Sequence, residues 1–407
     1  MVKSLHDAVV IGGGPAGSSF ALELAKRGFE VAVFEEHPEV GIPSHCAGHL
    51  SIRSLRNLGL HPLPESIVEN VFSVANFHSP LGSKFSVHLA KPVTCAVNRA
   101  KFDKLLAEKA EAAGAVFHLN SRVQSLMLQN GAVKGITVRE NELDENQVPA
   151  NLVVDAEGIS SRLLRQTGLQ GLNGKRLVYA VQAEVDGIRD VEDDAVEVYL
   201  GKKYAPGFYG WLIPKRNGSA KVGLATQKGN PKEFLDRLIG KHPVASKQLR
   251  SAKVKSMTFH TITLGGPIPK VYSDGFLAIG DCASQVKPTT GGGVVFSVTC
   301  ARIAAETAAN SLEQANFSES YLRTYQKELT KAVGFDVGVM LKARKVLDTL
   351  SDEKIERAIS FAQRAGLGKV LHDVDEIDFQ GRLLFSLARK PAAFSTIAYL
   401  AVLYFFS

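Results

Sequence analysis

The chain has 407 residues, 45% hydrophobic and 22% charged, which excludes a disordered protein and suggests about two to three domains. Its net charge of +7 favours an anionic partner: a phospholipid surface, a phosphorylated substrate or nucleic acid. Nucleic acid is the least favoured of the three, because the sequence has no Lys/Arg block interleaved with aromatic residues. Four scattered cysteines without a C-x-x-C pair argue against a metal site or disulfides and favour a reducing cytoplasm. The first residues enter a strand directly, so we expect no signal peptide.

A glycine-rich stretch near the N-terminus fits the dinucleotide-binding pattern G-x-G-x-x-G. The apolar residues 8–11 predict a buried strand, which breaks at Gly12, Gly14 and Gly17 and continues as a helix over residues 18–27. Gly12 allows the tight turn, Gly14 lets the backbone approach a pyrophosphate, and Gly17 lets the helix pack closely on the strand.

An acid in the expected place supports this interpretation. A second strand over residues 30–34 ends at Glu35, 18 residues after Gly17, where a carboxylate can accept a ribose hydroxyl bond. The positive end of the first helix, where Ala16 lies, would face the phosphates. An acid at this position favours FAD or NAD over NADP.

The next segments predict a mixed α/β domain, and a loop rich in turn residues over 37–48 directly follows the ribose acid. The further expected elements are a helix over 51–58, short strands within 72–87, a helix over 102–113, a strand over 116–119, a hairpin of 123–128 and 133–139, and a buried strand over 152–155.

The middle of the chain changes character and predicts a second, mostly antiparallel sheet inserted into the nucleotide domain. Its expected strands cover residues 178–185, 195–200, 208–213 and 221–226.

A strand over 275–279 then returns to the first domain and ends in Gly280-Asp281, before a glycine run and a helix over 294–312. Asp281 suits a sugar-alcohol chain at a helix N-terminus, and a helix cap or turn acid is the alternative for this residue taken alone.

Together these motifs resemble the FAD-dependent oxidoreductases of the aromatic-hydroxylase-like superfamily. Besides the glycines and Glu35, the matching pieces are Arg99 in Asn98-Arg99-x-x-Phe102-Asp103, Asp155-x-x-Gly158 and Gly280-Asp281. The resemblance implies FAD as cofactor. It also implies that Arg99 and the residues near Val123 line the FAD, that Asp281 meets its ribityl-phosphate region, and that the backbone at Gly293 and Val294 approaches the flavin ring. Asp155-x-x-Gly158 is usually tied to FAD and pyridine-nucleotide handling, and a strand-ending turn is the alternative.

Two further segments are similar to the geranylgeranyl reductases within that superfamily. The loop 43–48 looks like their Cys-Ala/Gly-Gly loop and makes Cys46 and Ala47 flavin-proximal candidates. The segment 206–215 resembles their Y-x-W-x-F-P segment, with Ile213 in place of Phe, while Thr-Gly-Gly-Gly-Val at 290–294 replaces Thr-Gly-Glu-Gly-Ile. The resemblance implies an FAD-dependent reductase that saturates isolated C=C bonds in geranylgeranyl chains of archaeal-type membrane lipids, or a close relative acting on another isoprenoid.

The order of these elements predicts a domain arrangement. We expect a Rossmann-like FAD-binding domain formed by residues 1–175 and 267–330, an antiparallel-sheet substrate domain over 176–266, and a helical C-terminal region over 331–407 with an apolar tail. Residues 72–92 could belong to the substrate domain instead.

Reduction of an isolated alkene needs a hydride donor such as reduced FAD, a proton for the other carbon, and a dry pocket. Cys46 is the first candidate proton donor, because a thiol is a weak acid with a pKa of about 8.5. Tyr209, His45 and His49 are alternatives, and each could instead be an ordinary loop residue. Trp211, with the aromatic residues around it, could form one wall of the lipid pocket or simply belong to a sheet core.

Two other functions fit parts of the sequence. A flavin monooxygenase or halogenase would explain Tyr209-x-Trp211-x-Ile213-Pro214, which is close to a W-x-W-x-I-P pattern, but the loop with Cys46 lacks the Gly-Glu-Ser expected in halogenases. A flavin electron-transfer protein is the alternative from another class. No second G-x-G-x-x-G follows a strand, so the electron donor, a ferredoxin-like protein or NADPH, is not identified.

The chain ends in an apolar tail over residues 391–407, preceded by Arg389-Lys390. Because a spanning helix needs about 20 apolar residues, the tail is slightly short to cross a bilayer. We expect a cytoplasmic protein with a peripheral contact at the inner membrane face, the alternative being a final helix packed on the protein's own core.

Overall fold

The computed structural model describes residues 5–139 and 145–405, and the chain divides into two compact units. The first unit comprises Met1–Ser44, Arg99–Lys175 and Thr263–Phe335; the second comprises His45–Asn98, Arg176–Ile262 and Asp336–Ser407. The expected combination of a Rossmann-like α/β part, an antiparallel sheet and C-terminal helices is confirmed. The boundaries differ from those expected, because residues 45–98 and 336–407 group with the antiparallel sheet.

Within the described residues, the first unit is built on an eight-stranded sheet in the order β17-β18-β11-β1-β2-β8, with β10 paired to β11 and β9 to β10. Its strands are β1 (His6–Ile11), β2 (Val31–Phe34), β8 (Val116–His118), β9 (Arg122–Gln129), β10 (Ala132–Arg139), β11 (Glu145–Asp155), β17 (Tyr272–Ser273) and β18 (Phe276–Ala278). From β18 to β8 the strands are parallel, and Ile11 lies opposite both Asp155 and Phe34. The carboxyl ends of these strands therefore meet at one edge, where open α/β sheets bind their ligands.

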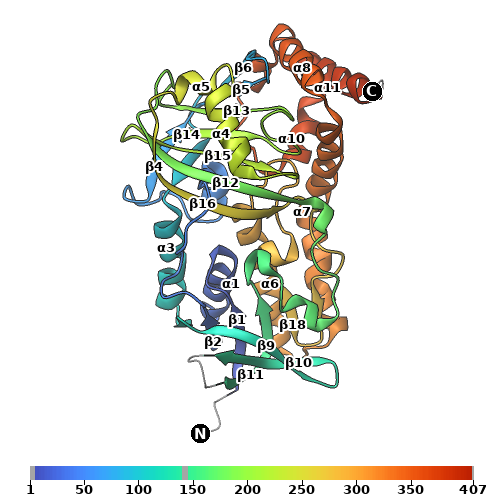
Figure 1. Ribbon diagram of the computed structural model, residues 1–407. Helices are drawn as coiled ribbons and strands as arrows, with labels where there is room; N and C mark the ends of the chain where they lie inside the picture. The colour runs from blue at the N-terminus through green and yellow to red at the C-terminus, as the bar shows by residue number, and fades with distance from the viewer. Residues whose placement is uncertain (1–4, 140–144, 406–407) are drawn as a thin grey trace. The chain divides into compact units, whose positions relative to one another are not determined.

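The helices of this unit are α1 (Pro15–Ala25), α3 (Arg99–Ala112), α6 (Val294–Glu313) and the first part of α7 (Glu319–Thr349), with 3₁₀ turns η1 (Gly158–Ser160), η2 (Leu164–Thr167) and η4 (Gly280–Ala283). Helix α1 packs against both α3 and α6 (Figure 1). It begins at Pro15, earlier than the expected residue 18, because proline is favoured at the first helical position.

The second unit contains a seven-stranded sheet in the order β16-β12-β15-β14-β13-β5-β6, counted over the part of the chain that the structure describes. Its strands are β5 (Val74–His78), β6 (Lys84–His88), β12 (Leu177–Asp186), β13 (Ala195–Tyr199), β14 (Gly210–Pro214), β15 (Ser219–Thr226) and β16 (Lys253–Thr263). Neighbours from β12 to β13 are antiparallel, whereas β5 joins β13 in parallel. The segment 72–92 thus supplies two strands of this sheet.

Alternation along the strands separates the two faces of this sheet. Leu212 and Leu224 face α4 (Pro231–Lys241) and α5 (Ala245–Gln248), and they form an apolar core with Leu235 and Leu238 of α4. Trp211 and Gly223 alternate with these residues and therefore lie on the opposite face.

The second unit also contains a three-stranded sheet of β3 (His49–Ser51), β7 (Thr94–Val97) and β4 (Val68–Phe72). Its other helices are the last part of α7 from Asp336, α2 (Ile52–Asn57), α8 (Asp352–Arg364), α9 (Leu367–Leu371), α10 (Gln380–Leu387) and α11 (Pro391–Phe405), while η3 (Gly174–Arg176) spans the boundary between the units in the sequence. Strand β6 packs against α8 and α9 through a core that includes Phe85, Val87 and Ile359. Among the residues placed in the structure, no helix combines the length and apolarity that crossing a bilayer requires.

Candidate functional site

The turn between β1 and α1 leaves open space where the glycine pattern predicts a pyrophosphate. Gly12 has a φ of +96°, a conformation that favours glycine. At Gly14 the backbone is extended, and an added Cβ would meet no protein atom within 4 Å. No side chain of the described residues caps α1, so its first N–H groups, near Ala16, are available to an anion. This arrangement fits the diphosphate of FAD.

Glu35 directly follows β2 and is 8% exposed. Its Oε2 accepts a hydrogen bond of 2.7 Å from the Gly13 N–H, and its Oε1 accepts one of 3.1 Å from the His37 N–H and lies 2.6 Å from His37 Nδ1. A carboxylate has about four acceptor positions, so Oε2 retains capacity for a ribose hydroxyl.

Arg99 and Val123 differ in the group that could contact FAD, which is a side chain in Arg99 and the backbone in Val123. Arg99 begins α3 and donates two hydrogen bonds to Asp103, from Nε at 2.9 Å and from Nη2 at 2.8 Å, which fix the plane of its guanidinium. The side chain of Val123 is buried in β9, and its carbonyl accepts a hydrogen bond from Arg162. Only the backbone of Val123 could therefore contact FAD, and its predicted lining role stays a prediction.

Asp281 lies in η4, beside the N-terminus of α6. A Cβ added at Gly293 would lie 3.0 Å from Asp281 Oδ1, so this carboxyl is close to the helix start at Val294. Burial raises the pKa of Asp281, and the positive charge of Arg99 lowers it. Asp281 therefore lies beside Gly293 and the helix start at Val294, and it is close enough to Arg99 for the charge of the guanidinium to act on its carboxyl. This grouping is compatible with a shared role in binding the cofactor.

Asp155 lies at the end of β11, next to the glycine turn. A Cβ at Gly12 would lie 2.5 Å from the Ala156 carbonyl oxygen, so the two strand-ending turns touch. Asp155 Oδ1 accepts a hydrogen bond of 3.0 Å from the Glu157 N–H, while Oδ2 is buried without a hydrogen-bond partner among the described residues. Burial, followed by the negative charge of Glu157, raises the pKa of Asp155 well above its usual value. Through Oδ1 the carboxyl therefore supports the turn.

The candidates Cys46 and Ala47 lie in the second unit, in the loop before β3. The thiol of Cys46 is partly exposed, and its Sγ accepts a hydrogen bond of 3.4 Å from the Gly48 N–H. The ring of His45 stacks on that of His260 at 3.7 Å, and His49 Nε2 lies 2.8 Å from Thr94 Oγ1.

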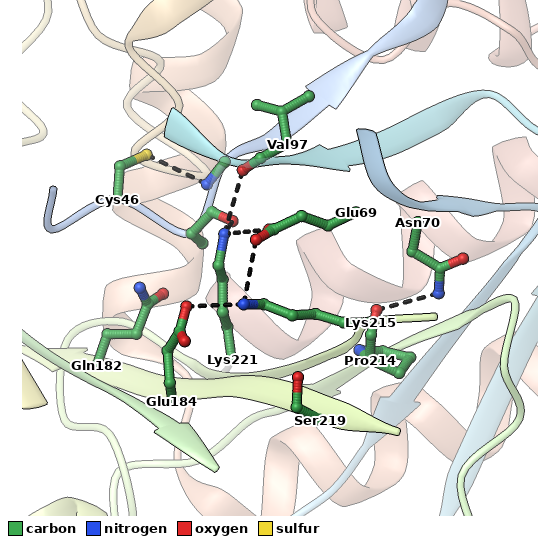
Figure 2. A network of polar contacts seen from close by, with 12 residues as sticks. Cys46, Glu69, Asn70, Val97, Gln182, Glu184, Pro214, Lys215, Ser219 and Lys221 are labelled. Carbon is green, nitrogen blue, oxygen red and sulfur yellow. Dashed lines mark hydrogen bonds and ion pairs between the residues drawn. The ribbon is translucent and has the colours of Figure 1, made fainter. Parts of the chain in front are cut away.

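A buried lysine holds this loop, and sequence reasoning missed it. Figure 2 shows the ammonium of Lys221 between Glu69 and the Val97 carbonyl. Lys221 also donates a hydrogen bond of 3.1 Å to the Ala47 carbonyl. The signal was available, because a lysine in the otherwise uncharged strand Ser219–Thr226 must find a partner if the strand is buried.

Tyr209 and Trp211 lie near each other, just before and within β14. Trp211 is 9% exposed and donates a hydrogen bond of 3.2 Å from Nε1 to Gln182 Oε1. A Cβ at Gly223 would come within 2.5 Å of the indole, so glycine is required where the ring lies on the sheet. The ring of Tyr209 is 6.1 Å from that of Trp211, edge to face. Burial raises the pKa of Tyr209, against the positive charge of Arg344.

The candidate residues are thus distributed between two units. Within the first, the structure groups the glycine turn with Glu35 and groups Asp281 with Gly293. Within the second, it places Cys46 and Ala47 in a loop tied to the sheet that carries Trp211. Over the described ranges, no cluster of His, Cys, Asp and Glu side chains is arranged to hold a metal ion.

Known proteins resemble this chain in sequence and in structure. Residues 6–334 match the family model described as an FAD binding domain. Digeranylgeranylglycerophospholipid reductase 2 of Methanothermobacter thermautotrophicus is 33% identical to this chain, over 91% of it and 94% of that protein. The protein of the same name from Methanopyrus kandleri is 32% identical, over 95% of this chain and 97% of its own length.

Solved structures show the same similarity. A geranylgeranyl bacteriochlorophyll reductase-like protein from Thermoplasma acidophilum superposes with a TM-score of 0.87 and 26% identity, covering 98% of this chain and 99% of that one. A flavin-dependent brominase has a TM-score of 0.71 and 19% identity, covering 90% of this chain and 93% of its own, and shares the fold alone.

Proposed function

The chain belongs to the FAD-binding oxidoreductases of the geranylgeranyl reductase family, and we propose that it saturates isolated C=C bonds in the geranylgeranyl chains of archaeal-type membrane lipids. The observation that carries this proposal is the match to proteins named digeranylgeranylglycerophospholipid reductase over nearly the full length of both chains. The open space at Gly14 and the acceptor at Glu35 support FAD as its cofactor.

An isolated alkene takes up a hydride at one carbon and a proton at the other. Reduced FAD supplies the hydride when it is bound, and the protein must deliver the proton. Cys46 is our candidate proton donor, because its thiol is the partly exposed one of the four and the Gly48 N–H stabilises the thiolate left behind.

Tyr209 is the alternative donor, and its burial favours it less than Cys46. The raised pKa of its phenol means that releasing a proton is harder than from an exposed tyrosine. We assign Tyr209 and Trp211 to the wall of the lipid pocket. Their rings present apolar surface, which would exclude water from the charge that develops on the alkene.

We also propose an external electron donor and a peripheral membrane contact. A ferredoxin-like protein or NADPH would return the two electrons that each reduction consumes. Two aromatic side chains on the last two described helices are exposed, Phe385 by 63% and Phe394 by 62%. They suit a contact with the inner face of the membrane, where a cytoplasmic enzyme would reach a lipid substrate.

The test is direct. The purified protein, supplied with FAD and dithionite, is incubated with geranylgeranylated glycerophospholipid, and the lipid is analysed by mass spectrometry. We expect a gain of two hydrogen atoms for each double bond reduced. Absence of any gain from a protein loaded with reduced flavin would refute the reductase. Substrate-coupled oxygen consumption, measured aerobically with NADPH in place of dithionite, would instead indicate a monooxygenase or halogenase.

A further inference from the structure

A buried lysine in strand β15 donates a hydrogen bond to the loop that contains Cys46. We propose that Lys221 is a positioning residue, whose ammonium fixes the backbone of the Cys46-Ala47-Gly48 loop and thereby the position of the Cys46 thiol. This inference rests on the proposed function, in which that thiol takes part in alkene reduction.

The three donors of the Lys221 ammonium each have an acceptor. Nζ lies 2.6 Å from Glu69 Oε2 and 3.1 Å from each of the Ala47 and Val97 carbonyl oxygens. An ammonium has three N–H groups, so these contacts use its full capacity. The side chain is 5% exposed, and all eight residues of its strand are buried, so water does not easily replace these bonds.

The two carbonyl groups belong to segments that are already in contact. Val97 ends β7 and donates a hydrogen bond of 2.9 Å from its N–H to the Gly48 carbonyl. Lys221 adds the bond to Ala47, the residue between the thiol and Gly48. The loop is therefore held at two consecutive carbonyls, those of Ala47 and Gly48. Because the Ala47 carbonyl and the Gly48 N–H share one peptide plane, the N–H that bonds the Cys46 sulfur has a defined direction.

A second lysine in the same network provides a matched control. Lys215 bonds Glu69 Oε1 at 3.1 Å and Glu184 Oε1 at 2.8 Å, and in the described part of the chain its ammonium contacts carboxylates only (Figure 2). Substitution of either lysine leaves Glu69 with one cation. Only Lys221 reaches the loop, so the two substitutions differ in the contact under test.

The first measurement is the rate of Cys46 alkylation by iodoacetamide at fixed pH. Cys95, Cys282 and Cys300 are buried, and burial raises the pKa of the Cys95 thiol to about 12, so the reagent reports on Cys46. We expect Lys221→Met to react about fivefold faster because a freed loop opens locally, and Lys215→Met to react at the wild-type rate. An unchanged rate in Lys221→Met would overturn the positioning role.

The second measurement separates this inference from the proposed function. With lipid substrate, we expect Lys221→Met to lower kcat about tenfold at unchanged KM, because substrate binding is intact and the reacting geometry is not. Faster alkylation with unchanged kcat would support the positioning role of Lys221 and contradict the role of Cys46 in alkene reduction. If Lys221→Met does not fold, Lys221→Met combined with Glu69→Gln removes both charges and gives the same alkylation readout.

Discussion

Gly14 and Gly17 stand three residues apart in the same pattern but serve different purposes. At Gly17 a Cβ would lie 2.0 Å from the Gly12 carbonyl oxygen, so glycine is required for the packing of α1 on its own turn. At Gly14 a Cβ would meet no protein atom within 4 Å, so glycine there keeps space for a ligand.

This difference predicts that valine substitutions at the two positions have different effects. Gly14→Val should fold like the wild type and lose nearly all bound flavin, because its side chain occupies the pyrophosphate space. Gly17→Val should lose stability itself. Flavin absorbance per protein and thermal unfolding distinguish the two, with Gly171→Ala as a control, because a Cβ there also meets no atom within 4 Å. Full flavin occupancy in Gly14→Val would contradict the assigned phosphate site.

Asp155 should make the free energy of unfolding depend on pH. Its pKa is raised by burial and by Glu157, so the folded protein keeps a proton that the unfolded chain releases above its ordinary pKa of 3.8. The free energy of unfolding therefore falls as pH rises above about 4, by up to about 1.4 kcal/mol per pH unit, until the folded carboxyl also ionises.

Asp155→Asn should remove this contribution, since an amide does not ionise. We expect a flatter dependence of the free energy of unfolding on pH, and a variant at least as stable as the wild type at pH 8, measured by urea unfolding at pH 5 and pH 8. Asp373→Asn, at an exposed acid, should leave the wild-type slope unchanged. An unaltered slope in Asp155→Asn would show that this carboxyl is ionised in the folded protein.

Local sequence patterns were enough to predict part of the candidate site. The glycines, Glu35 and Asp281 follow strand ends, so local pattern and sheet geometry suffice to place them at one edge. Lys221 could have been singled out as a charge in a strand without other charges, but its partner Glu69 lies 152 residues away along the chain. Nothing local in the sequence specifies such a pairing.

At the scale of elements, predictions succeeded where hydrophobic patterns were strong. The β1-α1-β2 unit, the β9-β10 hairpin and α6 were expected at nearly their observed bounds. Strand β16 was missed because it is an edge strand whose residues, apart from Thr263, are exposed or half-buried, so it lacks a buried face. The pairing of β5 with β13 joins residues 121 apart, such as Val74 and Ala195, and this contact assigns the segment 72–92 to the second sheet.

The C-terminal helix α11 has one side docked on the protein and another side exposed. One side docks, because the ring of Tyr399 stacks on Phe361 at 4.2 Å and the Leu403 carbonyl accepts a hydrogen bond of 2.8 Å from Lys354. Another side is open, because Phe394 is 62% exposed. Deleting the tail would uncover Phe361, so point substitutions are the better test of membrane contact.

Phe394→Ser and Phe385→Ser should each weaken binding to anionic vesicles about tenfold while leaving the fold intact, because an exposed aromatic ring loses its apolar insertion. Vesicle sedimentation measures the binding, and circular dichroism checks the fold. Leu81→Ser is the control, since Leu81 is 69% exposed in the turn between β5 and β6. Equal binding by all three variants and the wild type would exclude these helices as the membrane contact.

At the scale of the whole molecule, the candidate residues are divided by task. The turn, acid and helix-start residues that fit FAD belong to the first unit, and Cys46, Tyr209 and Trp211 belong to the second. Substituting a residue of the second unit should therefore affect the reaction without removing the cofactor. Cys46 is the sharpest case, because its side chain is small and serine replaces it at nearly equal volume.

Cys46→Ser should bind FAD as the wild type does and accept electrons from dithionite at the same rate. It should reduce geranylgeranylated lipid about 100-fold more slowly, because a serine hydroxyl is a far weaker acid than a thiol and proton delivery contributes on that scale. Flavin absorbance, anaerobic flavin reduction and lipid mass spectrometry measure the three steps separately. Unchanged turnover would show that Cys46 has only a packing role. Loss of FAD would show that its loop belongs to the cofactor site. Only slow lipid reduction with normal FAD binding and normal flavin reduction supports Cys46 as the proton donor.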